Sequence, residues 1–181
     1  MTKYIIISGV DGSGKTTVIE GVRKQLENQG LRVGYIWMRY HHKLITVMHA
    51  IAKLTGLAYK EKTEMGEMWL HRFYKSKLFG WFYIRCSYFD NWLAKNKPIK
   101  LAKKYKFDVV ICDRWVNDII IDMGSELHQT NILNTKWYKR YQSLLPNNSF
   151  QFVIIRGKSD VLNCRVENTF NEAFSYRYDL Y

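Results

Sequence analysis

Short runs of hydrophobic residues recur along the chain, separated by longer stretches with helical spacing. The runs are residues 4–8, 32–37, 108–112 and 150–155, and each is typical of a β-strand. Residues 109–112 are apolar without interruption, as expected for a strand that is covered on both faces. Strands that alternate with helices predict βαβ units. We therefore expect an α/β fold in three layers, with a mainly parallel sheet flanked by helices.

The segment between the second and third runs is too long for one crossover helix. Residues 43–106 carry two apolar blocks, which predict two or three helices as an insertion within a single domain of residues 1–181. The first block ends before Gly56, and the second, at residues 65–93, is rich in aromatic side chains. Most of these aromatics are expected to pack in the core. The alternative is that one or two of them stack on a base in a pocket.

Charge and cysteine content narrow the class of protein. The chain of 181 residues has a net charge of +12, but its basic residues are spread through helical patterns, which argues against a nucleic-acid partner. Cys86, Cys112 and Cys164 are scattered, so we expect neither a disulfide framework nor a zinc site, and a cytoplasmic location. No run resembles a signal peptide or a membrane span, so no membrane partner is expected.

The most specific motif follows the first predicted strand. Residues 9–17 read GVDGSGKTT, which is the phosphate-binding P-loop pattern G-x-x-x-x-G-K-[ST], and an amphipathic helical pattern follows. Glycines let such a loop curl around a phosphate at a helix N-terminus. Lys15 is expected to reach the β- and γ-phosphates, and Thr16 to ligate Mg²⁺. The predicted ATP-binding residues are Gly9, Asp11, Gly12, Ser13, Gly14, Lys15, Thr16 and Thr17.

A second motif, Asp113-Arg114, ends the third predicted strand. Ligands of open parallel sheets bind beyond the carboxyl ends of the strands, so both side chains are expected near residues 9–17. We predict that Asp113 supports Mg²⁺ together with Thr16, and that Arg114 points toward the phosphates. The alternative is a buried ion pair with a structural role alone.

Together, residues 9–17 and 110–115 resemble the thymidylate kinase family of P-loop nucleoside monophosphate kinases. That family carries Asp at the place of Asp11, and an aromatic residue follows its Asp-Arg pair as Trp115 does here. The resemblance implies a P-loop NTPase fold, ATP and Mg²⁺ as cofactors, and a transferase of nucleotide biosynthesis. It favours the phosphorylation of dTMP to dTDP, with small nucleotides as the partners.

The resemblance also implies roles for individual residues. Arg165 would act from a short lid at about residues 157–177, in a catalytic set with Lys15, Asp113 and Arg114. The acceptor side would lie against the helical insertion. The acceptor-binding candidates are Arg39, Arg72, Arg85, Trp115 and Asp118. A homodimer is implied by the family alone.

The far C-terminal part of the chain resembles the same family. Phe174, Arg177 and Tyr181 resemble the start of the family's last helix, beyond which the family has a further strand and helix. The sequence therefore predicts a domain that lacks its C-terminal strand and helix.

The chain departs from the family pattern on the acceptor side. Arg39 is followed by Tyr40, His41 and His42 in place of a Glu-Pro turn, and the adjacent histidines point apart on an extended segment, so no paired metal site is predicted there. Asp118 and Asp122 share one helical face. Two alternatives stay open: a kinase of another small acceptor, such as a nucleoside or another monophosphate, and an inactive P-loop protein with a protein or nucleic-acid partner.

Overall fold

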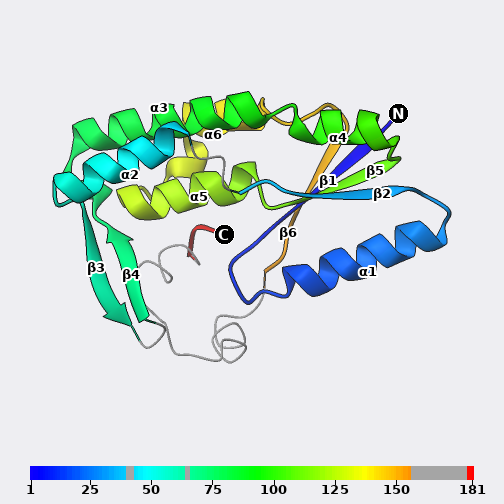
Figure 1. Ribbon diagram of the computed structural model, residues 1–181, viewed down its shortest axis with the longest axis horizontal. Coiled ribbons are helices and arrows are strands. Elements are labelled where there is room, and N and C mark those ends of the chain that lie inside the picture. The colour runs from blue at the N-terminus through cyan, green and yellow to red at the C-terminus, as the bar shows by residue number, and fades with distance from the viewer. Residues whose placement is uncertain (40–42, 64–65, 156–178) are drawn as a thin grey trace.

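A parallel sheet forms the centre of the protein in a computed structural model that describes residues 1–39, 43–63, 66–155 and 179–181 (Figure 1). Its strands are β1 (Lys3–Ser8), β2 (Val33–Trp37), β5 (Val109–Asp113) and β6 (Ser149–Val153), in the order β2-β5-β1-β6. All the neighbouring strands are parallel, and the register pairs Ile7 with Asp113. The four predicted strands are confirmed to within two residues at either end.

Helices cover both faces of this sheet, which confirms the α/β architecture. Helix α1 (Lys15–Asn28) packs over one face, where Ile7, Ile19 and Ile111 form a small core. Helix α4 (Lys97–Tyr105) lies on the opposite face, where the larger core begins at Ile6 and Val110. Successive residues of a strand point to opposite faces, so Ile6 and Ile7 enter different cores. Burial on both faces accounts for the uninterrupted apolar sequence of β5.

Among the described residues, the insertion between β2 and β5 contains three α-helices and a β-hairpin. The helices are α2 (Leu44–Leu54), α3 (Lys77–Ala94) and α4, and the short 3₁₀ helix η1 (Phe73–Lys75) precedes α3. The hairpin is formed by β3 (Ala58–Thr63) and β4 (Gly66–His71), and it projects away from the main sheet (Figure 1). The hairpin is a departure from the purely helical insertion that the sequence predicts. Trp69 consequently lies on a strand, opposite Lys60.

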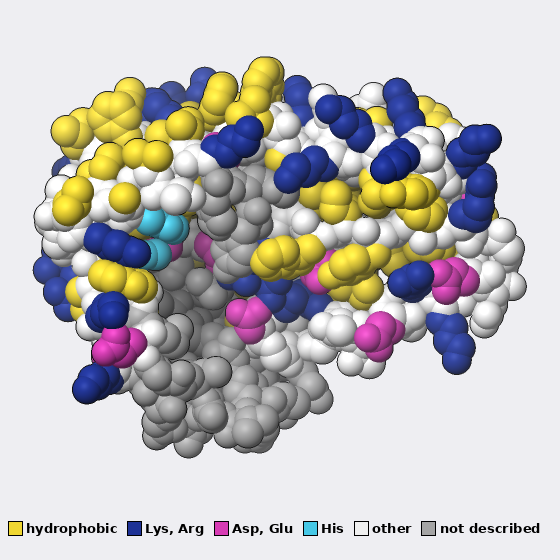
Figure 2. Space-filling view, viewed as in Figure 1, with side chains coloured by type: hydrophobic (Ala, Val, Ile, Leu, Met, Phe, Trp, Pro, Cys, Tyr) yellow, Lys and Arg dark blue, Asp and Glu magenta, His cyan; other side chains and the backbone are white. Residues whose placement is uncertain are grey.

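The aromatic side chains of the insertion divide between the core and the surface. Phe73, Phe79 and Tyr83 are buried, whereas Trp81 and Trp92 are about half exposed at 49% and 44%. Hydrophobic side chains gather over α2 and α3, while lysine and arginine are dispersed (Figure 2). The core packing expected for these aromatics is therefore confirmed for one face of α3 only. No helix among the described residues is both long enough and apolar enough to cross a membrane.

The chain after β5 returns to the sheet through a helical layer. Helix α5 (Val116–Leu127) is followed by the 3₁₀ helix η2 (Ile132–Asn134) and by α6 (Lys136–Gln142), which leads back to β6. Helix α5 is buried along most of its length and packs in the larger core. This position matters because α5 starts directly after Asp113 and Arg114. The helix therefore runs from the carboxyl edge of the sheet toward the hairpin (Figure 1).

Candidate functional site

The loop between β1 and α1 approaches the backbone of the neighbouring strand closely. A Cβ at Gly9 would lie 2.5 Å from the carbonyl oxygen of Ile154, and Gly9 has a φ of +147°. Gly14 is the N-cap of α1, with a φ of +88° and no side-chain capping bond. The first amide groups of a helix have no partner within the helix. The loop therefore ends on an uncapped helix N-terminus, which favours an anion.

A cavity of about 420 Å³ lies at this helix end and joins the two motifs. The lining residues are Asp11, Gly12, Gly14, Lys15, Thr16, Thr17, Asp113 and Arg114. They come together because β1 and β5 are parallel neighbours that end at the same edge of the sheet. Gly9 and Ser13 do not line the cavity. Ser13 is buried, and its Oγ has no hydrogen-bond partner among the described residues.

Lys15 is buried at the start of α1, with 7% of its surface exposed. Its ammonium donates a hydrogen bond to the carbonyl oxygen of Val10 at 2.6 Å. Burial and the nearby charge of Arg114 lower the pKa of Lys15 to about 8, against the opposing influence of Asp11 and other carboxylates. An anion in the cavity would stabilise the ammonium form. Lys15 is thus suited to bind a phosphate and is poorly solvated without one.

Arg114 ties the loop to α5 from a strained position. Its φ of 62° lies in the left-handed region, which costs a residue with a side chain about 1–2 kcal/mol. Its backbone N–H donates to Ile7 O at 2.8 Å and fixes the turn. Its guanidinium donates to Gly9 O at 3.3 Å, to Asp118 Oδ1 at 2.9 Å and to Asp11. Strain held in this way is common at functional sites.

Three carboxylates at successive turns form the acidic face of α5, defined as Asp118, Asp122 and Glu126. Asp118 is fully buried, and in addition to Arg114 it accepts a hydrogen bond from Tyr181 Oη at 2.5 Å. Asp122 forms an ion pair with Arg39 at 2.9 Å. Glu126 lies 2.7 Å from Nδ1 of His71. Each carboxylate of this face therefore has a basic partner brought from another part of the chain or from the preceding turn.

Arg39 reaches the same region from the end of β2. Its side chain is 9% exposed, and both its Nε and Nη2 donate to Asp122, at 3.0 and 2.9 Å. Its Nη1 lies 3.8 Å from Asp11 of the loop. The guanidinium thus lies between the acidic face of α5 and Asp11 of the loop.

Tyr35 is a site residue that sequence reasoning missed. Its hydroxyl donates to Asp113 Oδ2 at 2.6 Å. Burial and this hydrogen bond raise the pKa of Tyr35 to about 12. In the register of β2 and β5, Asp113 pairs with Trp37, so Tyr35 is its diagonal neighbour. No motif marks such a residue, because its position depends on which strand pairs with β5.

Other predicted acceptor residues lie away from the cavity. Trp115 is fully buried and belongs to the larger core. The guanidinium of Arg72 stacks on Tyr59 at 3.8 Å from the ring centre, and that of Arg85 stacks on Trp81 at 3.4 Å. None of these three side chains lines the cavity. Arg165, the lid at about residues 157–177, His41 and His42 lie outside the described residues.

The cavity has the chemistry for a polyphosphate with a divalent cation. Lys15 and the helix N-terminus supply positive charge and N–H donors at one side. Thr16 and Asp113 supply oxygen atoms, the ligand type that Mg²⁺ prefers. The chain matches no protein-family model, and no curated protein matches its sequence.

Proposed function

We propose that this chain is an ATP-dependent nucleoside monophosphate kinase with a P-loop fold, and that it converts dTMP to dTDP. The observation that carries the proposal is one cavity lined both by residues 11, 12 and 14–17 of the loop and by Asp113 and Arg114. A glycine-rich loop, a lysine, a hydroxyl and an acid at the end of an adjacent strand are the parts that phosphoryl transfer from ATP requires. The choice of dTMP rests on the resemblance of these motifs to thymidylate kinases.

On the donor side, the loop and α1 would hold the phosphates of ATP. Lys15 would place its ammonium on the β- and γ-phosphates, and the first amides of α1 would donate to the same oxygens. Thr16 and Asp113 would hold Mg²⁺, which neutralises charge on the phosphates when bound. Tyr35, through its bond to Asp113, would orient the carboxylate.

On the acceptor side, Arg39 and Arg114 would bind the monophosphate and the transferring group. Both guanidinium groups are engaged by carboxylates, Asp122 for Arg39 and Asp118 for Arg114. These carboxylates fix the orientation of each guanidinium group. The entropy lost when a phosphate binds is therefore smaller. Positive charge aligned along the donor–acceptor direction accounts for most of the catalysis in phosphoryl transfer. By resemblance, Arg165 would add charge from the lid.

A second candidate is a kinase whose acceptor is a hydroxyl group, such as a nucleoside. The acidic face of α5 favours it, because a hydroxyl acceptor needs a base or a hydrogen-bond acceptor near the transferred phosphate. Asp118 Oδ2 is buried and has no hydrogen-bond partner among the described residues. An Asp118→Asn variant would then lose turnover, whereas a phosphate acceptor makes Arg39→Ala the more damaging change.

The test is ADP release by the full chain with ATP–Mg²⁺ and a panel of nucleoside monophosphates and nucleosides. We expect turnover with dTMP, and a loss of at least 100-fold in Lys15→Ala. Lys24→Ala is the matched control, since Lys24 is an exposed lysine of the same helix. Tight ATP–Mg²⁺ binding without transfer to any member of the panel would contradict the proposal, and would favour a nucleotide-binding protein that lacks kinase activity.

A further inference from the structure

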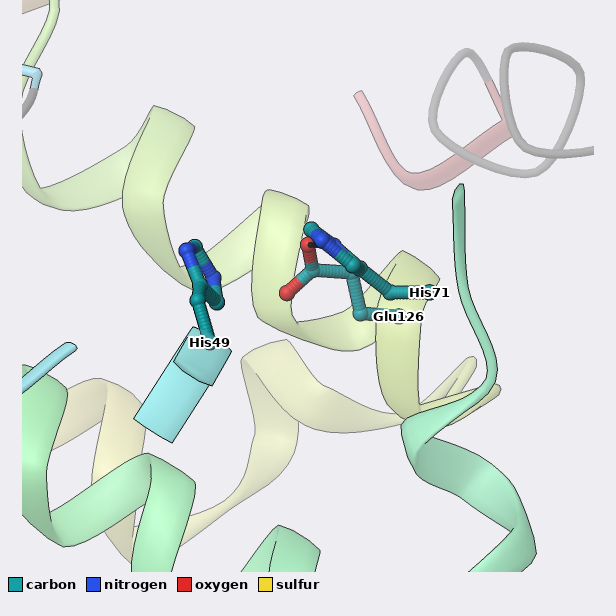
Figure 3. Close-up of side chains that lie close together, drawn as sticks. All are labelled: His49, His71 and Glu126. Atoms are coloured by element: carbon teal, nitrogen blue, oxygen red, sulfur yellow. Dashed lines mark hydrogen bonds and ion pairs between the residues drawn. The ribbon is translucent and has the colours of Figure 1, made fainter. Parts of the chain in front are cut away.

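We propose that His49, His71 and Glu126 form a binding site for a divalent transition metal ion of the zinc type. One nitrogen of each imidazole and one carboxylate oxygen lie within 4.8 Å of one another (Figure 3). The three residues come from α2, from the end of β4 and from α5. The group is separate from the phosphate cavity, because none of its members lines that cavity.

The donor set fits such an ion better than it fits Mg²⁺. Two imidazole nitrogens and one carboxylate oxygen form a common ligand set for zinc and for non-haem iron, whereas Mg²⁺ prefers oxygen alone. Metal–ligand bonds of about 2.1 Å at tetrahedral angles put the donor atoms about 3.4 Å apart. The widest pair at this site, at 4.8 Å or less, would therefore close by about 1.4 Å or less. Rotation of the side chains accommodates a shift of this size.

A second layer of residues already orients the ligands. Tyr83 Oη donates to Glu126 Oε2 at 2.5 Å. His71 Nδ1 and Glu126 Oε1 belong to two of the ligands themselves and lie 2.7 Å apart, so a bound ion would separate these two atoms or use the other donor atom of one side chain. The rings of His71 and Phe73 stack with centroids 4.6 Å apart, and those of His49 and His71 with centroids 4.8 Å apart. Phe73 is fully buried and Tyr83 is 6% exposed, so both side chains are enclosed by the core. Hydrogen bonds to metal ligands of this kind typically raise affinity 10- to 100-fold.

The site is reachable from solvent and lies at the junction of three elements. The side chains of His71 and Glu126 are 18% and 21% exposed, and histidine side chains are visible at the surface (Figure 2). Glu126 follows Asp118 by eight residues, which is about 12 Å along α5. A bound ion would join α2 and the hairpin to α5 through three protein ligands, and would leave a coordination position for water.

A simple ion pair between His71 and Glu126 is the competing explanation, and His49 distinguishes the two. An ion pair needs no third member, whereas a metal site with three ligands loses much of its affinity when His49 is replaced. The pair also needs a protonated imidazole, while metal ligation needs an unprotonated nitrogen.

The experiment is a titration of the full chain, freed of metal by a chelator, with Co²⁺ and then with Zn²⁺. Ligand-field absorption in the visible range reports Co²⁺ coordination, and its loss on adding Zn²⁺ reports displacement. We expect the wild-type chain to bind one equivalent of Co²⁺ in the presence of excess Mg²⁺. The affinity for Co²⁺ should be at least 100-fold weaker in His49→Ala and in Glu126→Gln. Tyr83→Phe should weaken binding about 10-fold.

Two control variants make the result specific. His128→Ala removes an exposed histidine from the end of α5, and Lys15→Ala alters the phosphate cavity; both should bind Co²⁺ as the wild type does. Absence of a one-equivalent Co²⁺ signal in the wild-type chain would overturn the proposal. A signal that survives both His49→Ala and Glu126→Gln would do so too. The readouts do not depend on kinase activity, so this proposal and the proposed function can fail separately.

Discussion

Arg114 and Asp118 are joined across the first turn of α5, where Arg114 Nη1 donates to Asp118 Oδ1 at 2.9 Å. The Asp118 side chain is fully buried and that of Arg114 is 10% exposed. Both charges therefore depend on each other in a region that water hardly reaches. The same arginine binds the loop through Gly9 and Asp11, so the pair connects α5 to the candidate phosphate site.

We expect Arg114→Ala and Asp118→Ala each to lower the free energy of unfolding by about 3–5 kcal/mol, because each leaves a buried charge without its main partner. The double variant should lose less free energy of unfolding than the two single variants lose in total. Urea unfolding measures all three. The exposed pair Arg23–Glu27, also at i,i+4 and 2.8 Å apart, is the control and should contribute a few tenths of a kcal/mol. Additive losses at Arg114 and Asp118 would contradict the coupling.

Gly9→Ala is expected to disrupt the loop more than a glycine replacement elsewhere with positive φ. An added Cβ would lie 2.5 Å from Ile154 O, next to the bond in which Ile154 N donates to Ser8 O at 2.8 Å. Gly30→Ala is the matched control, since Gly30 has a φ of +78° but open space around its Cβ position. The control should cost about 1–2 kcal/mol from backbone conformation alone. Equal losses in thermal or urea unfolding would show that the close approach to Ile154 is unimportant.

The lowered pKa of Lys15 predicts that the free energy of unfolding rises with pH in the alkaline range. Its pKa falls from 10.5 in the unfolded chain to about 8 in the folded protein, mainly through burial. Between these values the unfolded state binds more protons, so stability increases with pH. Relative to Lys15→Met, the wild-type protein should therefore gain stability from about pH 8 to 10.5, with a constant difference below pH 8. Parallel pH profiles of the two proteins in urea unfolding would refute this.

The lowered pKa of Glu126 also predicts a stability that rises with pH, in this case in the acid range. Burial raises the pKa of this carboxyl, but the hydrogen bond and charge of His71 and the hydrogen bond from Tyr83 outweigh it, so the pKa lies below the usual 4.5. The stabilisation is present above pH 4.5 and is lost as the pH falls through the folded pKa. Acid unfolding of metal-free protein should show a steeper loss in the wild type than in Glu126→Gln. The prediction is wrong if the two acid transitions have the same slope.

The strands, the flanking helices and the motif of residues 9–17 were accessible from the sequence alone. Apolar runs of five or six residues, helical spacing and glycine positions depend on neighbours along the chain, and such local patterns determine secondary structure. The proximity of Asp113 to the loop was also predictable, because parallel strands end at one edge of a sheet. The hairpin was missed, since its strands lie in a segment whose apolar blocks indicate helices.

The tertiary structure alone decided which distant side chains meet. The pairing of β2 with β5 brings Tyr35 to Asp113, which lies 78 residues later, and no local pattern reports that choice. Tertiary packing likewise placed Trp115 in the core, although it was a candidate for the acceptor side.

The same distinction applies to the two sites. The phosphate cavity is built largely from consecutive residues of one loop, so the sequence by itself determined most of its lining. The metal-site candidates lie on three different elements, and even the two nearest in sequence, His49 and His71, are 22 residues apart; the third is Glu126. Only the packing of α2 and the hairpin against α5 brings them within 4.8 Å, because side-chain contacts at that separation depend on the folded chain and not on spacing.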